Sequence, residues 1–144
     1  MPKFIVDFFP NVANYWDIFL TALTATYQMF FIAGLITLLI GGAFGISLIV
    51  TKTDGIKPNR IIHFILEVIT NVFRAVPFII LLIFLIPLTR SIAGTSIGVK
   101  GAVVPLVFGA VPFYTRQVET ALADVNPGKI EAARSMGSSI LGII

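Results

Sequence analysis

Ionisable and polar side chains gather on one face of a predicted helix, and these residues could do chemistry. The face, about 100° wide on a helical wheel, holds Arg60, His63, Glu67, Thr70, Asn71 and Arg74. Because carboxylates and imidazoles exchange protons, His63, Glu67 and Arg74 could form a proton relay in an ion-coupled carrier. Ionisable groups in a membrane span usually face protein or water, so a second interpretation is a buried polar seam that includes Glu67, Asn71 and Arg74. The equal alternative to the seam makes residues 61–70 an interfacial elbow, with the span starting near Asn71.

Other kinds of chemistry find little support in the sequence. The chain has no cysteine and one histidine, which argues against a thiol nucleophile, a disulfide or a metal site. The polar turn Thr89–Lys100 contains no G-x-x-x-x-G-K-[ST] phosphate loop. The net charge of +3 is scattered and suggests no nucleic-acid partner. We therefore expect no catalytic residues, no cofactor and no metal, and a protein that is not itself an enzyme.

A second polar element, Asn126–Gly137, has the sequence NPGKIEAARSMG. Asn126 is a good N-cap and Pro127 suits the first helical position. Gly137 can take the left-handed conformation that ends a helix. The small side chains of Ala132 and Ala133 give a flat surface that suits docking into a partner's cleft. An ordinary solvated surface helix is the equal alternative from these residues alone.

The elements that position these residues are predicted to be membrane spans. The composition is 57% hydrophobic and 12% charged, and the run Ile18–Thr51 has no charged residue, although about 20 residues suffice to cross a bilayer. We predict a first span from near Leu23 to near Val50, a second from Ile61 to about Leu88, and a third at Gly101–Thr115 that borrows flanking residues. In the third span, Arg116 and Glu119 can pair three residues apart. The fold class is thus an all-α membrane protein, a polytopic helix bundle with three spans.

Prolines and glycines add detail to these spans. Gly34, Gly41 and Gly45 share one stripe of the first span, and Gly41 with Gly45 would let another helix approach closely; a hinge is the less favoured alternative. In the second span Pro77 removes a hydrogen bond, and Pro87 helps to end the helix.

Loop charge predicts the orientation. The loop after the first span carries Lys52, Lys57 and Arg60, and basic loops lie on the cytoplasmic side. We therefore expect residues 1–22 to be an extracytoplasmic segment, residues 23–118 to hold the three spans, and residues 119–144 to be a cytoplasmic loop of a multi-pass cell-membrane protein. The chain ends at Ile144 in a renewed apolar run without a stop signal, so we expect a C-terminally truncated sequence.

These residues resemble a known family. Glu131-Ala132-Ala133, followed after three residues by Gly137, is similar to the EAA loop of ABC importer permeases. NVFRAVPFIILLIFLIPLTR (71–90), IAGTSIG (92–98) and VPLVFGAVPF (104–113) resemble the methionine-uptake permeases. The I-x-L-P element that follows the glycine in the family, and two further helices, lie beyond the end of this sequence.

The resemblance implies a type I ABC importer permease that forms the translocation path for D- or L-methionine. It implies a second permease copy, two ABC ATPase subunits that hydrolyse ATP, and an extracytoplasmic methionine-binding protein. It also implies that the EAA loop is a coupling helix, with Glu131, Ala132, Ala133, Arg134 and Gly137 as the ATPase-coupling residues. Outside the resemblance, an ion-coupled carrier and a non-transporting membrane scaffold are the alternatives, and neither explains a capped, alanine-rich helix.

Overall fold

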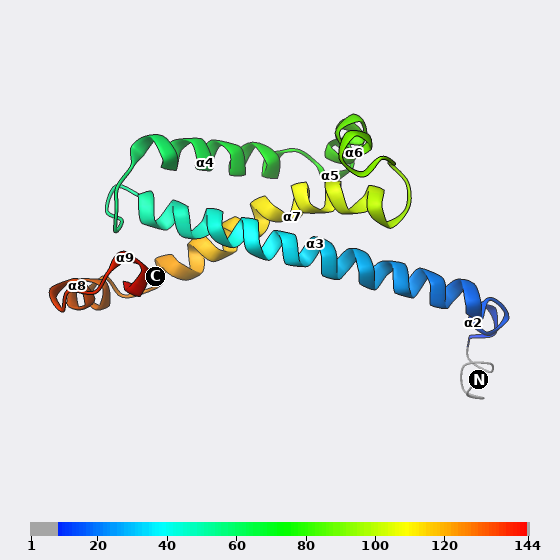
Figure 1. The fold of residues 1–144 in the computed structure, drawn as a ribbon, viewed down its shortest axis with the longest axis horizontal. Helices are drawn as coiled ribbons and strands as arrows, with labels where there is room; N and C mark the ends of the chain where they lie inside the picture. Colours follow the sequence, from blue (N-terminus) through cyan, green and yellow to red (C-terminus); the bar gives the residue numbers. More distant parts are fainter. Residues whose placement is uncertain (1–8, 144) are drawn as a thin grey trace.

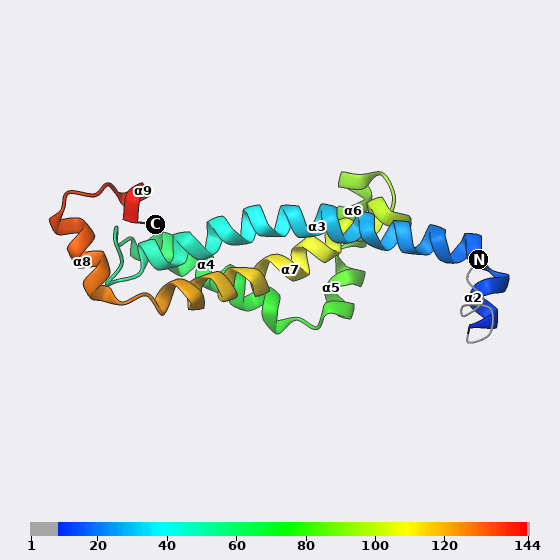
Figure 2. The same cartoon turned by 90° about the horizontal axis from the view of Figure 1, so that it is seen from below.

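The structure is a computed structural model that describes residues 9–143, and every regular element in that range is a helix (Figure 1). The helices are α2 (Pro10–Asn14), α3 (Trp16–Thr51), α4 (Arg60–Ala75), α5 (Phe78–Phe84), α6 (Ile86–Ala93), α7 (Gly98–Ala123), α8 (Pro127–Ser135) and α9 (Ile140–Ile143). Helices α3, α4 and α7 pack together as a bundle. Figure 2 shows that α8 runs across the direction of α3 and α7 at the end where α3 meets α4. The predicted all-α helix bundle is confirmed.

Three spans are present if the second is counted as a bent pair. Helices α3 and α7 are each long and apolar enough to cross a membrane, and α4 with α5 passes the same test as a pair bent by 104°. Helix α3 begins at Trp16 rather than near Leu23. Its 36 residues span about 54 Å, well beyond a hydrocarbon core of about 30 Å. Its N-terminal end extends past the other long helices (Figure 1).

The second apolar stretch is not the continuous helix predicted for Ile61–Leu88. Helix α4 is unbroken from Arg60 to Ala75, so the chain has no break near Asn71, where the elbow alternative starts the span. The chain bends at Val76, whose backbone is extended (φ −82°, ψ 124°). The ring of Pro77 disfavours a helical conformation in the preceding residue, which explains why the break lies there.

The prediction for Pro87 and the following turn needs a similar correction. Pro87 lies in the first turn of α6 rather than at the end of a span. Helix α6 then takes up the start of the predicted turn Thr89–Lys100 and ends at Gly94, which is left-handed with φ 72°. Helix α7 begins at Gly98 and continues to Ala123. The prediction that the third span needs flanking residues is therefore confirmed.

The closest helix contact joins α3 to α7 at two of the predicted glycines. A Cβ atom added at Gly41 would lie 2.9 Å from Cδ1 of Tyr114, and one at Gly45 would lie 2.6 Å from Cβ of Val118. The hydroxyl of Thr115, which is fully buried, donates a hydrogen bond to the carbonyl of Gly41 at 3.3 Å. These glycines therefore serve helix packing, as predicted, and α3 shows no break that would suit a hinge.

Gly45→Ala should destabilise the bundle, because the new methyl group would overlap Val118 and the Thr115 carbonyl oxygen. Overpacking of this kind typically costs about 1–3 kcal/mol. The matched control is Gly34→Ala on the same helix, where the added Cβ meets none of the described residues within 4 Å. The free energy of unfolding, or the melting temperature, of the full-length protein in detergent would measure both. Equal stability of the two variants would contradict the close contact.

Candidate functional site

Helix α8 has the ends that its sequence predicts. The Oδ1 atom of Asn126 accepts a hydrogen bond from the backbone N–H of Gly128 at 2.8 Å, and Pro127 stands at the first helical position. After the helix, Gly137 adopts φ 76°. The Gly137 N–H donates to the carbonyl of Arg134 at 2.9 Å, and the Ser138 N–H donates to that of Ala133 at 3.0 Å. These paired bonds form a Schellman motif, so both ends of α8 are closed by residues of its own sequence.

The predicted coupling residues differ in their exposure to solvent and in their contacts with the rest of the chain. Glu131 and Ala132 are exposed, and Ala133 is half-buried. The guanidinium of Arg134 turns back to the loop between α3 and α4, where it donates to the carbonyls of Ile56 at 3.0 Å and Gly55 at 3.3 Å. Sequence reasoning treated Arg134 as a charge for a partner, whereas in the structure it fastens α8 to the bundle.

Gly55 is a functional position that sequence reasoning missed. A Cβ atom there would lie 2.5 Å from the carbonyl oxygens of both Ile49 and Val50, so the tight loop requires glycine. This loop brings two carbonyls to the position where Arg134 meets them. Because the partners are 78 and 79 residues apart, no local pattern could have indicated the contact.

The polar face of α4 meets one arginine of α7. The Arg116 guanidinium lies 3.7 Å from a carboxylate oxygen of Glu67 and donates to Oδ1 of Asn71 at 2.8 Å. It also forms the predicted ion pair with Glu119, at 2.5 Å. Two of the three predicted seam residues therefore contact the same arginine of another helix, although Asn71 itself is exposed.

The remaining residues of this face extend the contact to α3. Nδ1 of His63 lies 3.1 Å from the carbonyl oxygen of Leu48, and its Nε2 lies 3.8 Å from Glu67. Thr70 is 1% exposed. The cluster thus links α3, α4 and α7 close to the end of the bundle that carries the basic loop.

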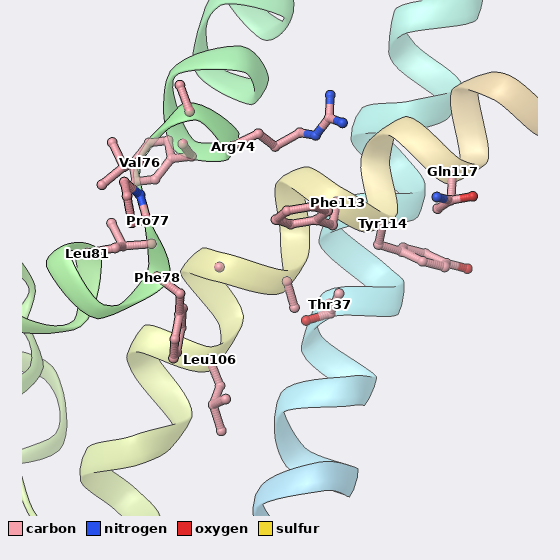
Figure 3. Close-up of a pocket in the computed structure, with 14 residues that line it drawn as sticks. Thr37, Arg74, Val76, Pro77, Phe78, Leu81, Leu106, Phe113, Tyr114 and Gln117 are labelled. Carbon is pink, nitrogen blue, oxygen red and sulfur yellow. The ribbon is translucent and has the colours of Figure 1, made fainter.

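Arg74, the third predicted seam residue, does not join this cluster. Its guanidinium carbon lies 5.4 Å above the ring centroid of Phe113 on α7. It borders a separate pocket of about 910 Å³ between α3, α7 and the α4–α5 break (Figure 3). Glu67 and Arg74 are therefore parts of different sites, although they share one face of a helix. No group of three His, Cys, Asp or Glu residues that could hold a metal is found within residues 9–143.

Comparison with known proteins gives a consistent family match. Residues 41–144 match the family described as "binding-protein-dependent transport system inner membrane component". The D-methionine transport system permease protein MetI of Yersinia pestis is 45% identical over 119 residues, which cover 83% of this chain and 55% of that protein. MetI of Escherichia coli K12 is 44% identical over 119 residues, which again cover 83% of this chain and 55% of that protein.

Solved structures agree with the sequence match. A chain of the MetNI methionine ABC transporter, in an inward-facing native crystal form, superposes with a TM-score of 0.83 at 43% identity. The match covers 86% of this chain and 57% of that one. A second inward-facing form of the same transporter gives a TM-score of 0.80 at 44% identity. The chain thus spans little more than half the length of the relatives that it matches.

Arg116→Gln should destabilise the bundle, because the change removes the positive charge that Glu67 and Glu119 share. A polar group left without its partner typically costs about 1–3 kcal/mol. Arg90→Gln is the matched control, since the contact found for Arg90 in the described part of the chain is a 3.3 Å hydrogen bond to Ser96. Unfolding of the full-length protein in detergent would compare them, and equal losses would argue against a structural role for the cluster.

Proposed function

Since the chain belongs to the family of inner membrane components of binding-protein-dependent transport systems, we propose that it is a permease subunit of an ABC importer for methionine. The observation that carries this proposal is the 45% identity to a D-methionine transport permease, together with a shared fold in the methionine transporter MetNI. The chain is a multi-pass membrane protein by family and by its long apolar helices. In the proposed complex, two permease copies form the path, and an extracytoplasmic binding protein delivers methionine.

We propose that α8 couples this permease to two separate ABC ATPase subunits, which carry out the hydrolysis of ATP. Its exposed Glu131 and Ala132 support a docking surface with room for close approach. The Schellman end at Gly137 and the Arg134 contacts to the α3–α4 loop support transmission. Because α8 is fastened to the bundle, a push on it would reach α3 and α4.

The orientation follows from the positive-inside rule. We place the N-terminal segment outside, and the α3–α4 loop and α8 in the cytoplasm. Counted together with the inner end of α7, the proposed inner regions carry six Lys or Arg residues, namely Lys52, Lys57, Arg60, Arg116, Lys129 and Arg134, while the outer ones carry Lys3, Arg90 and Lys100.

No specific contact favours the ion-coupled carrier. Glu67 and His63 are engaged by Arg116 and by the Leu48 carbonyl, and Arg74 lies in a different site. We assign the Glu67 cluster to helix packing instead. A scaffold without transport function has no structural observation in its favour.

Ala132→Phe should reduce ATPase association and methionine uptake, because a bulky ring would overlap a close-fitting groove. Overpacking costs about 1–3 kcal/mol, or roughly 5- to 150-fold in affinity. Ala43→Phe, at an exposed alanine of α3, is the matched control. The measurement is ATPase pull-down and uptake with the reconstituted full-length permease. Normal values for Ala132→Phe would make α8 an ordinary surface helix.

Gly137→Val should also reduce ATPase association and methionine uptake. The cause would be the backbone, because a β-branched residue rarely adopts φ 76°. Gly137→Asn is the matched control, since asparagine tolerates the left-handed conformation at a helix end. Asparagine should retain most of the uptake that valine loses. Equal uptake by both variants would show that the helix end does not matter for coupling.

The orientation predicts opposite labelling of two exposed serines, Ser91 on α6 and Ser138 after α8. Ser91→Cys should react with an impermeant thiol reagent on intact cells, whereas Ser138→Cys should react only after permeabilisation. The chain has no native cysteine to interfere. The reverse pattern would invert the topology.

A further inference from the structure

The pocket beside Arg74 has the features of a small-molecule site. It lies where the α4–α5 break faces α3 and α7, and its volume of about 910 Å³ is within the range of about 300–1,000 Å³ of known ligand sites. Its wall is mainly apolar, with Phe78, Leu81 and Leu106 among the lining residues. Figure 3 shows the few polar side chains that join this wall, among them Thr37, Arg74 and Gln117.

Thr37 supplies a buried hydroxyl without a partner. The residue is 7% exposed, and its Oγ1 atom has no hydrogen-bond partner among the described residues. Threonines elsewhere on α3 donate to carbonyls of their own helix, as Thr26 does to Ala22 and Thr51 to Ser47. The Thr37 hydroxyl points instead away from the α3 ribbon, on the side of α7 (Figure 3). A buried polar atom in this state is expected to meet water or a ligand.

Arg74 supplies a cation at membrane depth. It is fourteen residues after Arg60, which places it about 21 Å along α4 from the basic loop. Its guanidinium lies over Phe113, and no carboxylate of the described residues pairs with it. A guanidinium binds a carboxylate through two parallel hydrogen bonds, and the interaction strengthens away from water.

The break between α4 and α5 supplies hydrogen-bond acceptors beside the same pocket. The last four carbonyls of a helix have no partner within it, and they carry partial negative charge. Irregular backbone at membrane depth is tolerated where it is buried in protein or lines a cavity, and Ala75, Val76 and Pro77 line this pocket. The Pro77 carbonyl already accepts from the N–H groups of Ile80 and Leu81, so the carbonyls of Ala75 and Val76 are the ones that can accept hydrogen bonds from an ammonium group.

We propose that this pocket binds the zwitterion of a neutral, apolar α-amino acid, with its carboxylate on Arg74. The ammonium group lies toward the carbonyls at the end of α4, the side chain lies among Phe78, Leu81 and Leu106, and Thr37 lines the side of the pocket next to α3. The lining residues include no Asp or Glu, so a cationic side chain would find no counter-charge. The inference rests on the proposed function, since it gives the importer's cargo a site within the membrane.

Uptake of radiolabelled L-methionine by the full-length permease, reconstituted with its ATPase and binding protein, tests the assignment. Arg74→Gln should lower uptake by roughly tenfold or more, since the interaction lost is an ionic hydrogen bond. Thr37→Val, which keeps the shape and removes the hydroxyl, should lower it several-fold. The matched controls are Arg90→Gln and Thr26→Val, which lie outside the pocket and should stay near wild type. Unchanged uptake in both pocket variants would overturn the assignment, whereas a wild-type complex that does not carry methionine would overturn the proposed function.

A second measurement gives a result even if Arg74→Gln does not assemble. Thr37→Cys in the purified complex should react with a small water-soluble thiosulfonate, because the proposed pocket is open to ligand. Millimolar L-methionine should slow this reaction, and lysine at the same concentration should not. An unreactive cysteine would mean that protein fills the pocket in the complete assembly. That result, or equal protection by lysine, would overturn the proposal.

Discussion

The close approach of α3 to α7 is the contact on which the other sites depend. Gly41 and Gly45 let the α7 backbone come within reach of α3, and the Thr115 hydroxyl bonds to the Gly41 carbonyl at the crossing. In a membrane, where lipid is as apolar as leucine, such packing and hydrogen bonding replace the hydrophobic drive between helices. The crossing sets the rotation of α7. As a result, Arg116, which directly follows Thr115, contacts α4, and Phe113 lines the pocket.

The break at Val76 and Pro77 lies at the end of a helix face that contributes to two separate sites. Before it, Glu67 and Asn71 bond to Arg116 and hold the bundle together. At the break, Arg74 turns to a pocket instead of to that cluster. The 104° bend exposes backbone that must line a cavity or be covered by protein.

Helix α8 is capped by residues of its own segment, and a side chain of α8 bonds it to the bundle. Its caps come from Asn126 and Gly137, both within its own segment. Its described hydrogen bonds to the rest of the chain run from Arg134 to the loop at Gly55 and Ile56. Its exposed Glu131 and Ala132 remain available to a partner.

The sequence by itself determined whatever depends on near neighbours or on apolar length. The caps of α8, the Arg116–Glu119 pair, the three apolar stretches and the glycine contact surface were all predictable, because each involves residues within a few turns of one helix. The start of α3 was predicted wrongly, since apolar composition does not mark where a helix begins. The sequence indicated a lost hydrogen bond at Pro77 but not the 104° bend beside it. Only the tertiary structure decided that Arg116 meets Asn71, 45 residues away, that Arg134 meets Gly55, 79 residues away, and that the Thr37 hydroxyl is buried without a partner in the described part of the chain. The physical reason is that these contacts depend on how the helices cross, and a crossing is set by the packing of side chains far apart in the chain.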